Sequence, residues 1–470
     1  MVTQQAGIDD DRLRRISSLD TGNAHVNEDT HVRNRAAMTA VEPPGSRLST
    51  HVGTHGARRA FVGATIGNAV EWYDFAVYGF VAPYIGASFF PTGNSTTELL
   101  SSFAVFGLTF LVRPLGGLIF GPLGDRVGRK RVMVLVLVVM AVATTVVGLL
   151  PDYRTIGVAA PVLLVLLRCL QALSAGGEYG SASTFMVEYA GPRRRARGSS
   201  WMMFSAVLGF MAGSGIAAGL AAAAGTGAMS AWGWRIPFLV AAPLGAIALY
   251  IRLKLEDTPE FRALRARDAL SRTPLRETFK LPRTLAVTAG IGALHATAFY
   301  IVMSYMTTYI ASVLRLGSAL ALASTLTAGA VALVTLPVVA TVADRVGRRA
   351  VLLPVAVATA VCGYPIFLLI STRTVIAVIA GHALLAVLLA AFISTSVTTM
   401  AEVFPAKLRS SGVSVGYNLS AALFGGTAPF IATFLVSSTK NIRTPAWYLV
   451  CVAVIAVIAV AALRKPEEGA

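Results

Sequence analysis

A small set of charged and amide side chains lies inside long apolar stretches of this 470-residue chain. Its members are Glu71, Asp74, Arg113, Arg168, Gln171 and Glu178. A charge at the centre of a membrane-spanning helix costs about 2.5–3.5 kcal/mol on insertion scales, so such residues are expected to face a cavity and to pair. Glu71 and Asp74 are three residues apart, which places both on one helix face together with Tyr78. Three acids and two arginines in one half of the chain can therefore form ion pairs that a proton could break.

The carboxylates are the candidates for proton binding. Burial raises the pKa of a carboxyl group and a neighbouring arginine lowers it, so a rearranging cavity could load and release a proton. We expect Glu71 or Asp74 to take this coupling role, and we assign Glu178 to the same group. The alternative is that these charges are fixed structural pairs that hold the helices together.

Arg113 and Arg168 could also bind the carboxylate of a substrate, because a guanidinium group offers a planar pair of donors. Gln171 and Tyr78 share helix faces with these charges and are expected to join the same site. Structural pairing is the alternative. It is favoured for Arg113, which directly precedes Pro114 and lies close to a polar loop.

Other kinds of chemistry lack the residues that they need. No His/Cys spacing typical of metal ligands occurs, and Cys169, Cys362 and Cys451 lie in apolar runs at unrelated spacings. The phosphate-binding motif G-x-x-x-x-G-K-[ST] is absent, so ATP is not expected to drive the protein directly. No nucleophile–base constellation is visible. We therefore expect neither an enzyme nor a metal or other cofactor.

The composition indicates an integral membrane protein. Hydrophobic residues make up 55% of the chain and charged residues 13%, whereas a soluble domain usually carries about 25% charged residues. A membrane span needs roughly 20 apolar residues, and lipid admits only helices or closed barrels. The apolar stretches predict twelve membrane helices, at 60–87, 98–122, 132–150, 157–187, 199–224, 235–254, 285–311, 319–342, 350–370, 375–401, 412–436 and 446–463.

The basic residues separate according to loop. With both chain ends on one side, the segments on that side after the N-terminal stretch hold 24 Lys and Arg, against 6 on the other side. Cytoplasmic loops of membrane proteins carry such an excess. We therefore expect a multi-pass protein of the cytoplasmic membrane with both termini in the cytoplasm. The net charge of +17 then reflects topology and requires no nucleic-acid partner.

The chain contains an internal repeat. Residues 124–130 read G-D-R-V-G-R-K after the second predicted span, and residues 343–349 read A-D-R-V-G-R-R after the eighth. A weaker similarity links residues 188–198 with residues 402–412, which follow the fourth and tenth spans. Two parallel six-helix repeats are typical of transporters that bind a substrate between their halves.

The repeated loop resembles the signature of the major facilitator superfamily. Residues 67–75 (G-N-A-V-E-W-Y-D-F) are similar to the metabolite:proton symporter family within it, as are 113–117, 168–171, 176–178 and 402–405 with Arg409. The resemblance covers roughly residues 60–465. It implies proton-coupled uptake, in a family that includes proline/betaine, 2-oxoglutarate, citrate and shikimate carriers.

On this interpretation the repeated loops control conformation. Asp125 is expected at the end of the second span, where it can pair with basic loop residues and with the N-terminus of a facing helix. These contacts would stabilise the state that is closed on the cytoplasmic side, and the loop glycines would permit a tight turn. The alternative is that the basic residues serve orientation only. The predicted gating residues are Gly124, Asp125, Arg126, Gly128, Arg129, Asp344, Arg345, Gly347 and Arg348.

Residues of the second half complete the predicted substrate site. Tyr300 belongs to an aromatic group in the seventh span, and aromatic faces attract quaternary ammonium groups, which would suit betaine. Tyr417 and Asn418 are expected to line the cavity from a Gly-rich stretch of the eleventh span. His295 and His382 could relay protons, but a packing role is favoured for both.

Together these features predict an all-α membrane protein with twelve transmembrane helices in two pseudo-symmetric six-helix bundles. The predicted function is proton-coupled symport of a small organic acid or zwitterion, of the proline/betaine or dicarboxylate type, by alternating access. An efflux carrier of the same superfamily and a non-transporting receptor on the same fold are the alternatives. The expected partners are a small-molecule substrate, a proton and the lipid bilayer, without nucleic acid, and we expect a monomer.

The predicted organisation has five parts. They are a disordered cytoplasmic N-terminal tail (1–57), an N-terminal bundle (58–254), a cytoplasmic central loop (255–284), a C-terminal bundle (285–464) and a short cytoplasmic tail (465–470). The central loop is expected to form a short amphipathic helix at the membrane surface.

Overall fold

The computed structural model describes the backbone of residues 54–463, and their side chains except at 54–64, 95, 96, 226 and 318. Most of both expected tails therefore lies outside the described residues. Long helices dominate because an apolar stretch in lipid must satisfy its own backbone hydrogen bonds. The long helices of the first half are α2 (Thr54–Phe89), α3 (Ser95–Val127), α4 (Arg129–Leu149), α6 (Ala159–Ala190), α7 (Arg195–Ala231) and α8 (Ile236–Leu253).

The second half repeats this arrangement with more interruptions. Its helices are α11 (Pro282–Phe299), η2 (Tyr300–Tyr305), α12 (Met306–Thr308), η3 (Tyr309–Val313), α13 (Ser318–Val346), α14 (Arg348–Ile370), α15 (Val375–Glu402), α16 (Arg409–Ser420), η5 (Ala421–Gly425), α17 (Ala428–Thr439) and α18 (Thr444–Ala461). The segments η2, η3 and η5 are π-helical. The runs α11–η3 and α16–α17 each correspond to one predicted span.

The predicted fold class is confirmed, although the helices extend beyond most of the predicted ends. Eleven helices or helix runs of the described residues are long and apolar enough to cross a membrane. Helix α2 is not among them, and it carries the polar residues Asn68, Glu71 and Asp74. All three side chains are buried, so α2 has a protein-facing polar side.

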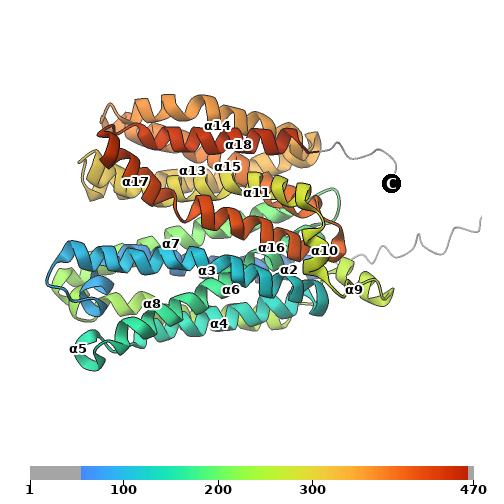
Figure 1. Cartoon of the computed structure of the whole chain (residues 1–470), viewed down its shortest axis with the longest axis horizontal. Coiled ribbons are helices and arrows are strands. Elements are labelled where there is room, and N and C mark those ends of the chain that lie inside the picture. Colours follow the sequence, from blue (N-terminus) through green and yellow to red (C-terminus); the bar gives the residue numbers. More distant parts are fainter. Residues whose placement is uncertain (1–53, 464–470) are drawn as a thin grey trace, which may run out of the picture. The chain divides into compact units, whose positions relative to one another are not determined.

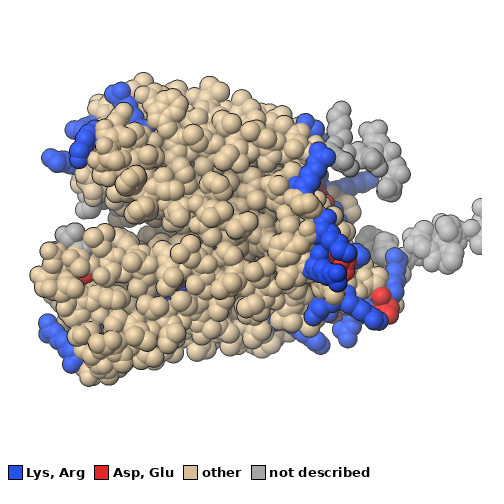
Figure 2. All heavy atoms as spheres, in the orientation of Figure 1, with Lys and Arg blue, Asp and Glu red and all other residues tan. Residues whose placement is uncertain are grey.

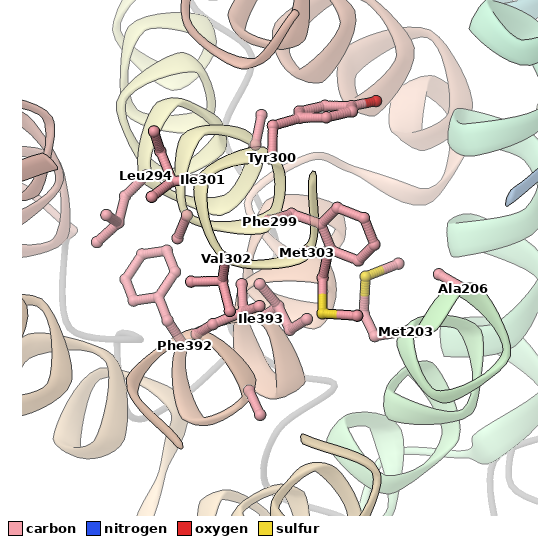
Figure 3. Close-up of a cluster of buried hydrophobic side chains, with 14 of the residues drawn as sticks. Met203, Ala206, Leu294, Phe299, Tyr300, Ile301, Val302, Met303, Phe392 and Ile393 are labelled. Carbon is pink, nitrogen blue, oxygen red and sulfur yellow. The ribbon is translucent and has the colours of Figure 1, made fainter. Parts of the chain in front are cut away.

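The long helices form two bundles (Figure 1). In the first, α2 packs on α7, α3 on α6, and α4 on α6 and α8. In the second, α13 packs on α15, and α14 on α15 and α18. The bundles meet where α3 contacts α16 and where α7 contacts α13. The largest apolar core lies at this junction, where Met203 of α7 lies beside Met303 and Phe299 (Figure 3).

Lys and Arg side chains gather at one end of the molecule (Figure 2). We call this the basic end; it holds the start of α4, the end of α13 and the central segment between the bundles (Figure 1). The central segment contains two short helices, α9 (Pro259–Ala266) and α10 (Pro274–Phe279), where the sequence predicted one. Three further short helices connect longer ones: α5 (Tyr153–Ile156), η1 (Gly233–Arg235) and η4 (Ala406–Leu408).

Candidate functional site

The buried charges of the first bundle form three acid–arginine pairs. Glu71 accepts a hydrogen bond from Arg113 Nη2 at 3.0 Å, and Asp74 accepts one from Arg168 Nη1 at 2.8 Å. Glu178 is paired with Arg252. Each of these six residues is at most 4% exposed. Each acid has its own arginine, so the set carries no net charge when fully ionised.

Arg252 of α8 supplies the partner of Glu178, a role that the sequence did not predict. It was counted with the basic loops, whereas its guanidinium group is buried and donates to Met133 O at 2.6 Å as well as to Glu178. The group lies over Gly67 of α2, where a Cβ atom would overlap it. The signal was present in the sequence, because three acids and two arginines leave one acid without a partner.

The Asp74 pair belongs to a network inside the first bundle. Gln171 Nε2 donates to Asp74 Oδ1 at 3.1 Å and to Thr144 Oγ1 at 2.7 Å, and Arg168 Nη1 donates to Gln171 Oε1 at 2.9 Å. Tyr78 places its ring 4.1 Å from Arg168 Cζ. Its hydroxyl donates to Ser102 O at 3.1 Å. These partners all belong to the first bundle, so the structure does not place Gln171 and Tyr78 between the two halves.

The Glu71–Arg113 pair faces the second bundle. Arg113 has Tyr179, Tyr300 and Tyr417 as electrostatic neighbours in addition to Glu71. Tyr300 lies edge-on to Phe110, with ring centroids 5.1 Å apart. Within the described part of the chain, Arg113 Nε and Nη1 lack a well-formed hydrogen bond, although the Tyr300 hydroxyl lies close to the guanidinium group. This pair therefore combines a buried acid, free guanidinium donors and aromatic faces from both bundles.

The aromatic surroundings extend across the junction. Trp72 of α2 approaches Phe299 of α11 at 4.3 Å between ring centroids. Tyr179 of α6 stacks on Tyr417 of α16 at 3.4 Å and 7°. His295 lies edge-on to both tyrosines, and its Nδ1 is 2.7 Å from Ser396 Oγ.

Asn418 lies at a helix contact. Its Nδ2 donates to Gly176 O at 2.7 Å and to Ser414 O at 2.7 Å. A Cβ atom at Gly117 of α3 would approach the same amide, so three helices converge on it. These contacts place Asn418 where α16 packs on α3 and α6. Its neighbour Tyr417, in contrast, lies beside Arg113.

At the basic end, Asp125 of α3 binds the N-terminus of α16 in the other bundle. Its carboxylate accepts hydrogen bonds from the backbone N–H groups of Ser410 (3.2 Å) and Ser411 (2.8 Å) and from the Ser411 hydroxyl (2.6 Å). Arg129 lies 3.3 Å from the same carboxylate. A carboxylate at a helix N-terminus satisfies free N–H donors and interacts favourably with the helix dipole.

Asp344 makes the equivalent contact in the opposite direction. This carboxylate of α13 accepts from the backbone N–H groups of Ala196 at 2.9 Å and Arg197 at 3.0 Å, at the start of α7. Arg348 lies 3.7 Å from it. Each bundle therefore caps a helix of the other through the same position of the repeated loop.

Two glutamates extend these contacts in the same pseudo-symmetric way. Glu188 is paired with Arg129 of its own bundle at 3.3 Å and with Arg409 of the other bundle at 3.1 Å. Glu402 is paired with Arg348 at 3.1 Å and with Arg195 at 3.4 Å. These two glutamates begin the similar segments 188–198 and 402–412, for which the sequence predicted no specific contact.

The central segment joins this network through residues that the sequence analysis did not single out as partners. Glu260 of α9 accepts from Arg195 of the first bundle at 2.8 Å and from Arg409 of the second at 2.5 Å. Thr258 donates to Glu188. Asp257 accepts from the backbone N–H of Arg129 at 3.0 Å, at the start of α4. The start of α9 is thus fastened to both bundles.

The remaining predicted loop residues differ in their placement. Gly128 and Gly347 adopt positive φ angles of 110° and 95°, which favours glycine at these two helix junctions. Gly124 lies inside α3, where a Cβ atom would crowd Ser410, so it serves close packing and forms no turn. Arg126 donates to the carbonyl oxygen of Arg272. Arg345 is exposed.

Two helical bundles with reciprocal caps and a polar site at their junction define a membrane transporter of the alternating-access kind. The Major Facilitator Superfamily model matches residues 64–415 and 316–470, and the chain belongs to this family. Among residues 54–463, no group of three His, Cys, Asp or Glu side chains is placed to hold a metal ion.

The chain is also similar to individual transporters and to solved transporter structures. The chain is 36% identical to the proline/betaine transporter of Escherichia coli (strain K12) over 445 residues, covering 92% of this chain and 89% of that protein. It is 37% identical over 426 residues to an ectoine/proline transporter of Corynebacterium glutamicum, covering 87% and 84% of the two chains. Among solved structures, the proton:xylose symporter XylE has the same fold, with a TM-score of 0.70 at 14% identity over 86% of this chain and 95% of that chain.

Proposed function

We propose that this protein is a proton-coupled symporter that takes up a small zwitterion of the proline or betaine type across the cytoplasmic membrane. One observation carries the proposal: the buried Glu71–Arg113 pair lies at the junction of the bundles, with free guanidinium donors beside aromatic rings. The names of the relatives support the substrate class, since two of them are described as transporting proline.

Each part of such a zwitterion has a matching group in this site. The substrate carboxylate would bind the free Nε and Nη1 donors of Arg113, because guanidinium and carboxylate match as planar groups. The substituted ammonium group would lie against the faces of Phe110 and Tyr300, which attract cations. Charged groups at both ends of the ligand would therefore have partners, which offsets their loss of hydration.

Protonation of Glu71 would couple this binding to the proton gradient. While Glu71 is ionised, it holds Arg113 in an ion pair; once protonated, it releases the guanidinium group for the substrate carboxylate. Asp74 and Glu178 are less suited to this role. Asp74 is bound by both Arg168 and Gln171, and Glu178 accepts twice from Arg252. We therefore assign proton exchange to Glu71 and positional roles to the other two acids.

The reciprocal caps would control access to the site. With Asp125 and Asp344 holding helices of the opposite bundle, the basic end is closed and the substrate would enter from the other end. The excess of Lys and Arg at the basic end supports its placement in the cytoplasm. The structure would then correspond to the state that receives substrate and proton from outside the cell.

Purified protein in liposomes provides the test. A thermal-shift screen against proline, glycine betaine, 2-oxoglutarate, citrate and shikimate first identifies ligands, since a ligand that binds only the native state raises its stability. We expect proline or betaine to raise the unfolding temperature. Labelled ligand should then accumulate in liposomes whose lumen is alkaline relative to the medium.

The two alternatives give different results. An efflux carrier would expel preloaded ligand under an inward proton gradient when the external side of the protein faces outward. A receptor would show the thermal shift without counterflow of labelled against unlabelled ligand. Glu256→Gln serves as a matched control, because Glu256 is an exposed carboxylate that is paired with Arg262 at the surface. Its uptake should equal that of the unmodified protein.

A further inference from the structure

His382 is a buried histidine that the transport scheme above does not use. It lies in α15 with no exposed surface and makes two hydrogen bonds. Nε2 is 2.8 Å from the carbonyl oxygen of Val302, and Nδ1 is 2.8 Å from the hydroxyl of Ser324 in α13. Because a carbonyl oxygen can only accept, Nε2 carries the proton and Nδ1 accepts from Ser324. The ring therefore connects α13, α15 and the α11 run in one defined tautomer.

Val302 belongs to the π-helical turn η2, which begins at Tyr300. At the end of this turn the backbone N–H of Met306 donates to Ile301 O, five residues back instead of four. A π-turn holds one residue more than the corresponding α-helical turn, and such turns are rare and occur frequently at functional sites. A side-chain donor that binds a carbonyl group inside the turn stabilises it against return to an α-helix.

The π-turn sets the direction of Tyr300 relative to the rest of the helix. Figure 3 shows Tyr300 directed away from Phe392 and Ile393 of α15, whereas Val302 is directed toward them. Loss of one residue from the turn would rotate one side of the helix relative to the other by about 100°, since an α-helix has 3.6 residues per turn. Tyr300 would then leave its position beside Phe110 and Arg113.

We infer that His382 is a positioning residue for the substrate site: through Val302 it holds the π-turn that directs Tyr300 toward Arg113. It does not touch the substrate and exchanges no proton in this role. The inference rests on the proposed function for its transport readout. Its structural readout, the stability of the π-turn, is independent of any substrate.

Three substitutions separate the hydrogen bond to Val302 from simple packing. His382→Gln places an amide N–H near the position of Nε2, whereas His382→Asn reaches only the position of Nδ1. His382→Leu keeps a comparable volume without donors. We expect His382→Leu and His382→Asn to raise KM for proline or glycine betaine about tenfold, with Vmax within about twofold, and His382→Gln to restore KM. Equal behaviour of the Asn and Gln variants would overturn the inference.

A double-variant cycle tests whether His382 acts through Tyr300. Tyr300→Phe leaves the ring and removes the hydroxyl, and Tyr300→Ala removes both. If His382 acts through Tyr300, His382→Leu should raise KM no further in the Tyr300→Ala background. Additive effects would contradict this coupling.

Hydrogen exchange measured by mass spectrometry gives the readout that needs no substrate. Amide exchange in peptides covering residues 300–306 should become faster in His382→Leu and His382→Asn, and remain slow in His382→Gln. Unchanged exchange in all three variants would refute the anchoring. If the unmodified protein transports neither proline nor betaine, the proposed function fails, while the exchange comparison still decides the role of His382.

Discussion

At the residue scale, the three acid–arginine pairs differ in what surrounds them. Asp74 and Glu178 are held by several donors within one bundle, whereas Glu71 accepts a hydrogen bond from Arg113 and faces the other bundle. A buried ion pair contributes little net stability, because desolvation of both charges offsets their attraction. Removal of one partner is costly, since it leaves an unpaired buried charge. The pairs are therefore expected to respond differently to substitution.

Glu71→Gln should uncouple transport from the proton gradient. One charge crossing a potential of 100 mV gains about 2.3 kcal/mol, which supports roughly fiftyfold accumulation. The neutral amide cannot exchange a proton, so accumulation should fall to the level without a gradient, while counterflow of labelled substrate persists. Asp74→Asn should instead lower the unfolding temperature, because it weakens the partner of Arg168. Gradient-driven accumulation by Glu71→Gln would disprove the assignment.

Arg252→Met should destabilise the first bundle. Breaking a buried ion pair on one side typically costs about 3–5 kcal/mol, whereas replacing both partners with apolar residues is often neutral. The unfolding temperature should therefore fall for Arg252→Met and recover in the double variant Glu178→Leu/Arg252→Met. Gly67→Ala provides an independent check, because its Cβ atom would displace the guanidinium group. It should destabilise the unmodified protein and not the double variant.

At the element scale, the two repeated loops make equivalent contacts. Positions 125 and 344 each cap a helix of the opposite bundle, and Glu188 and Glu402 each join an arginine of their own bundle to one of the other. The symmetry means that neither bundle can turn away at the basic end without breaking both caps. Helix α9 adds a third connection through Glu260, which is paired with both bundles.

Helix α10 is attached through Glu277, and this attachment should be insensitive to pH in the range where transport is measured. The Ser271 hydroxyl and then Lys407 stabilise its carboxylate and lower the pKa of Glu277 below its ordinary value of 4.5. A lowered pKa in the folded state contributes stability above the ordinary value, and this contribution is lost as the pH falls through the lowered value. Between about pH 5.5 and 8 the contact should therefore remain constant.

Limited trypsin cleavage at Arg276 and Lys280 measures this attachment. The ratio of the cleavage rate of Glu277→Gln to that of the unmodified protein, measured at each pH between about 5.5 and 8, should stay constant, because the pH dependence of trypsin itself cancels in the ratio. Glu277→Gln should increase cleavage at every pH, because it removes the charge that binds Lys407. A ratio that falls toward one as the pH falls toward 5.5 would contradict the expected direction of the shift, because the unmodified protein would then lose the same contact. Proton effects on transport would then include a contribution from the linker.

At the scale of the whole molecule, the sequence predicted the long helices because the apolar runs are about as long as a membrane span. It could not predict the interruptions in the second half, since the π-turns that begin at Tyr300, Tyr309 and Ala421 leave no mark in the hydropathy. The buried acids were visible as charges in apolar runs. Their partners were only partly visible, because Arg252 lies at a helix end and its burial depends on Gly67 of a distant helix.

The sequence predicted which kinds of residue belong to the candidate site better than it predicted which of them lie together. Arg113, Tyr300 and Tyr417 were selected from separate spans and lie together in the structure. Tyr78, Gln171 and Asn418 were selected on the same grounds and bind partners elsewhere. Helical spacing identifies residues that share a face, but it does not identify the helix that this face meets. That information depends on how the two halves dock.

The closed basic end makes a prediction about the conformational equilibrium of the whole protein. Spin labels at Leu253 of α8 and Val346 of α13, both exposed helix ends, report the separation of the bundles at this end. Labels at Leu100 of α3 and Ile376 of α15 report the opposite end. Native Cys169, Cys362 and Cys451 are first replaced by serine or alanine.

Asp125→Asn removes the charge that binds the α16 N-terminus and keeps the side-chain shape. A charge–helix contact is worth about 0.3–2 kcal/mol, so the open population at the basic end should rise between about 1.7- and 30-fold. The Leu253–Val346 distances should lengthen while the Leu100–Ile376 distances shorten, and Asp344→Asn should act in the same direction because its cap is equivalent. Glu256→Gln should leave both distributions unchanged. If Asp125→Asn leaves the distributions of the unmodified protein intact, the repeated loops serve orientation in the membrane and not the control of access.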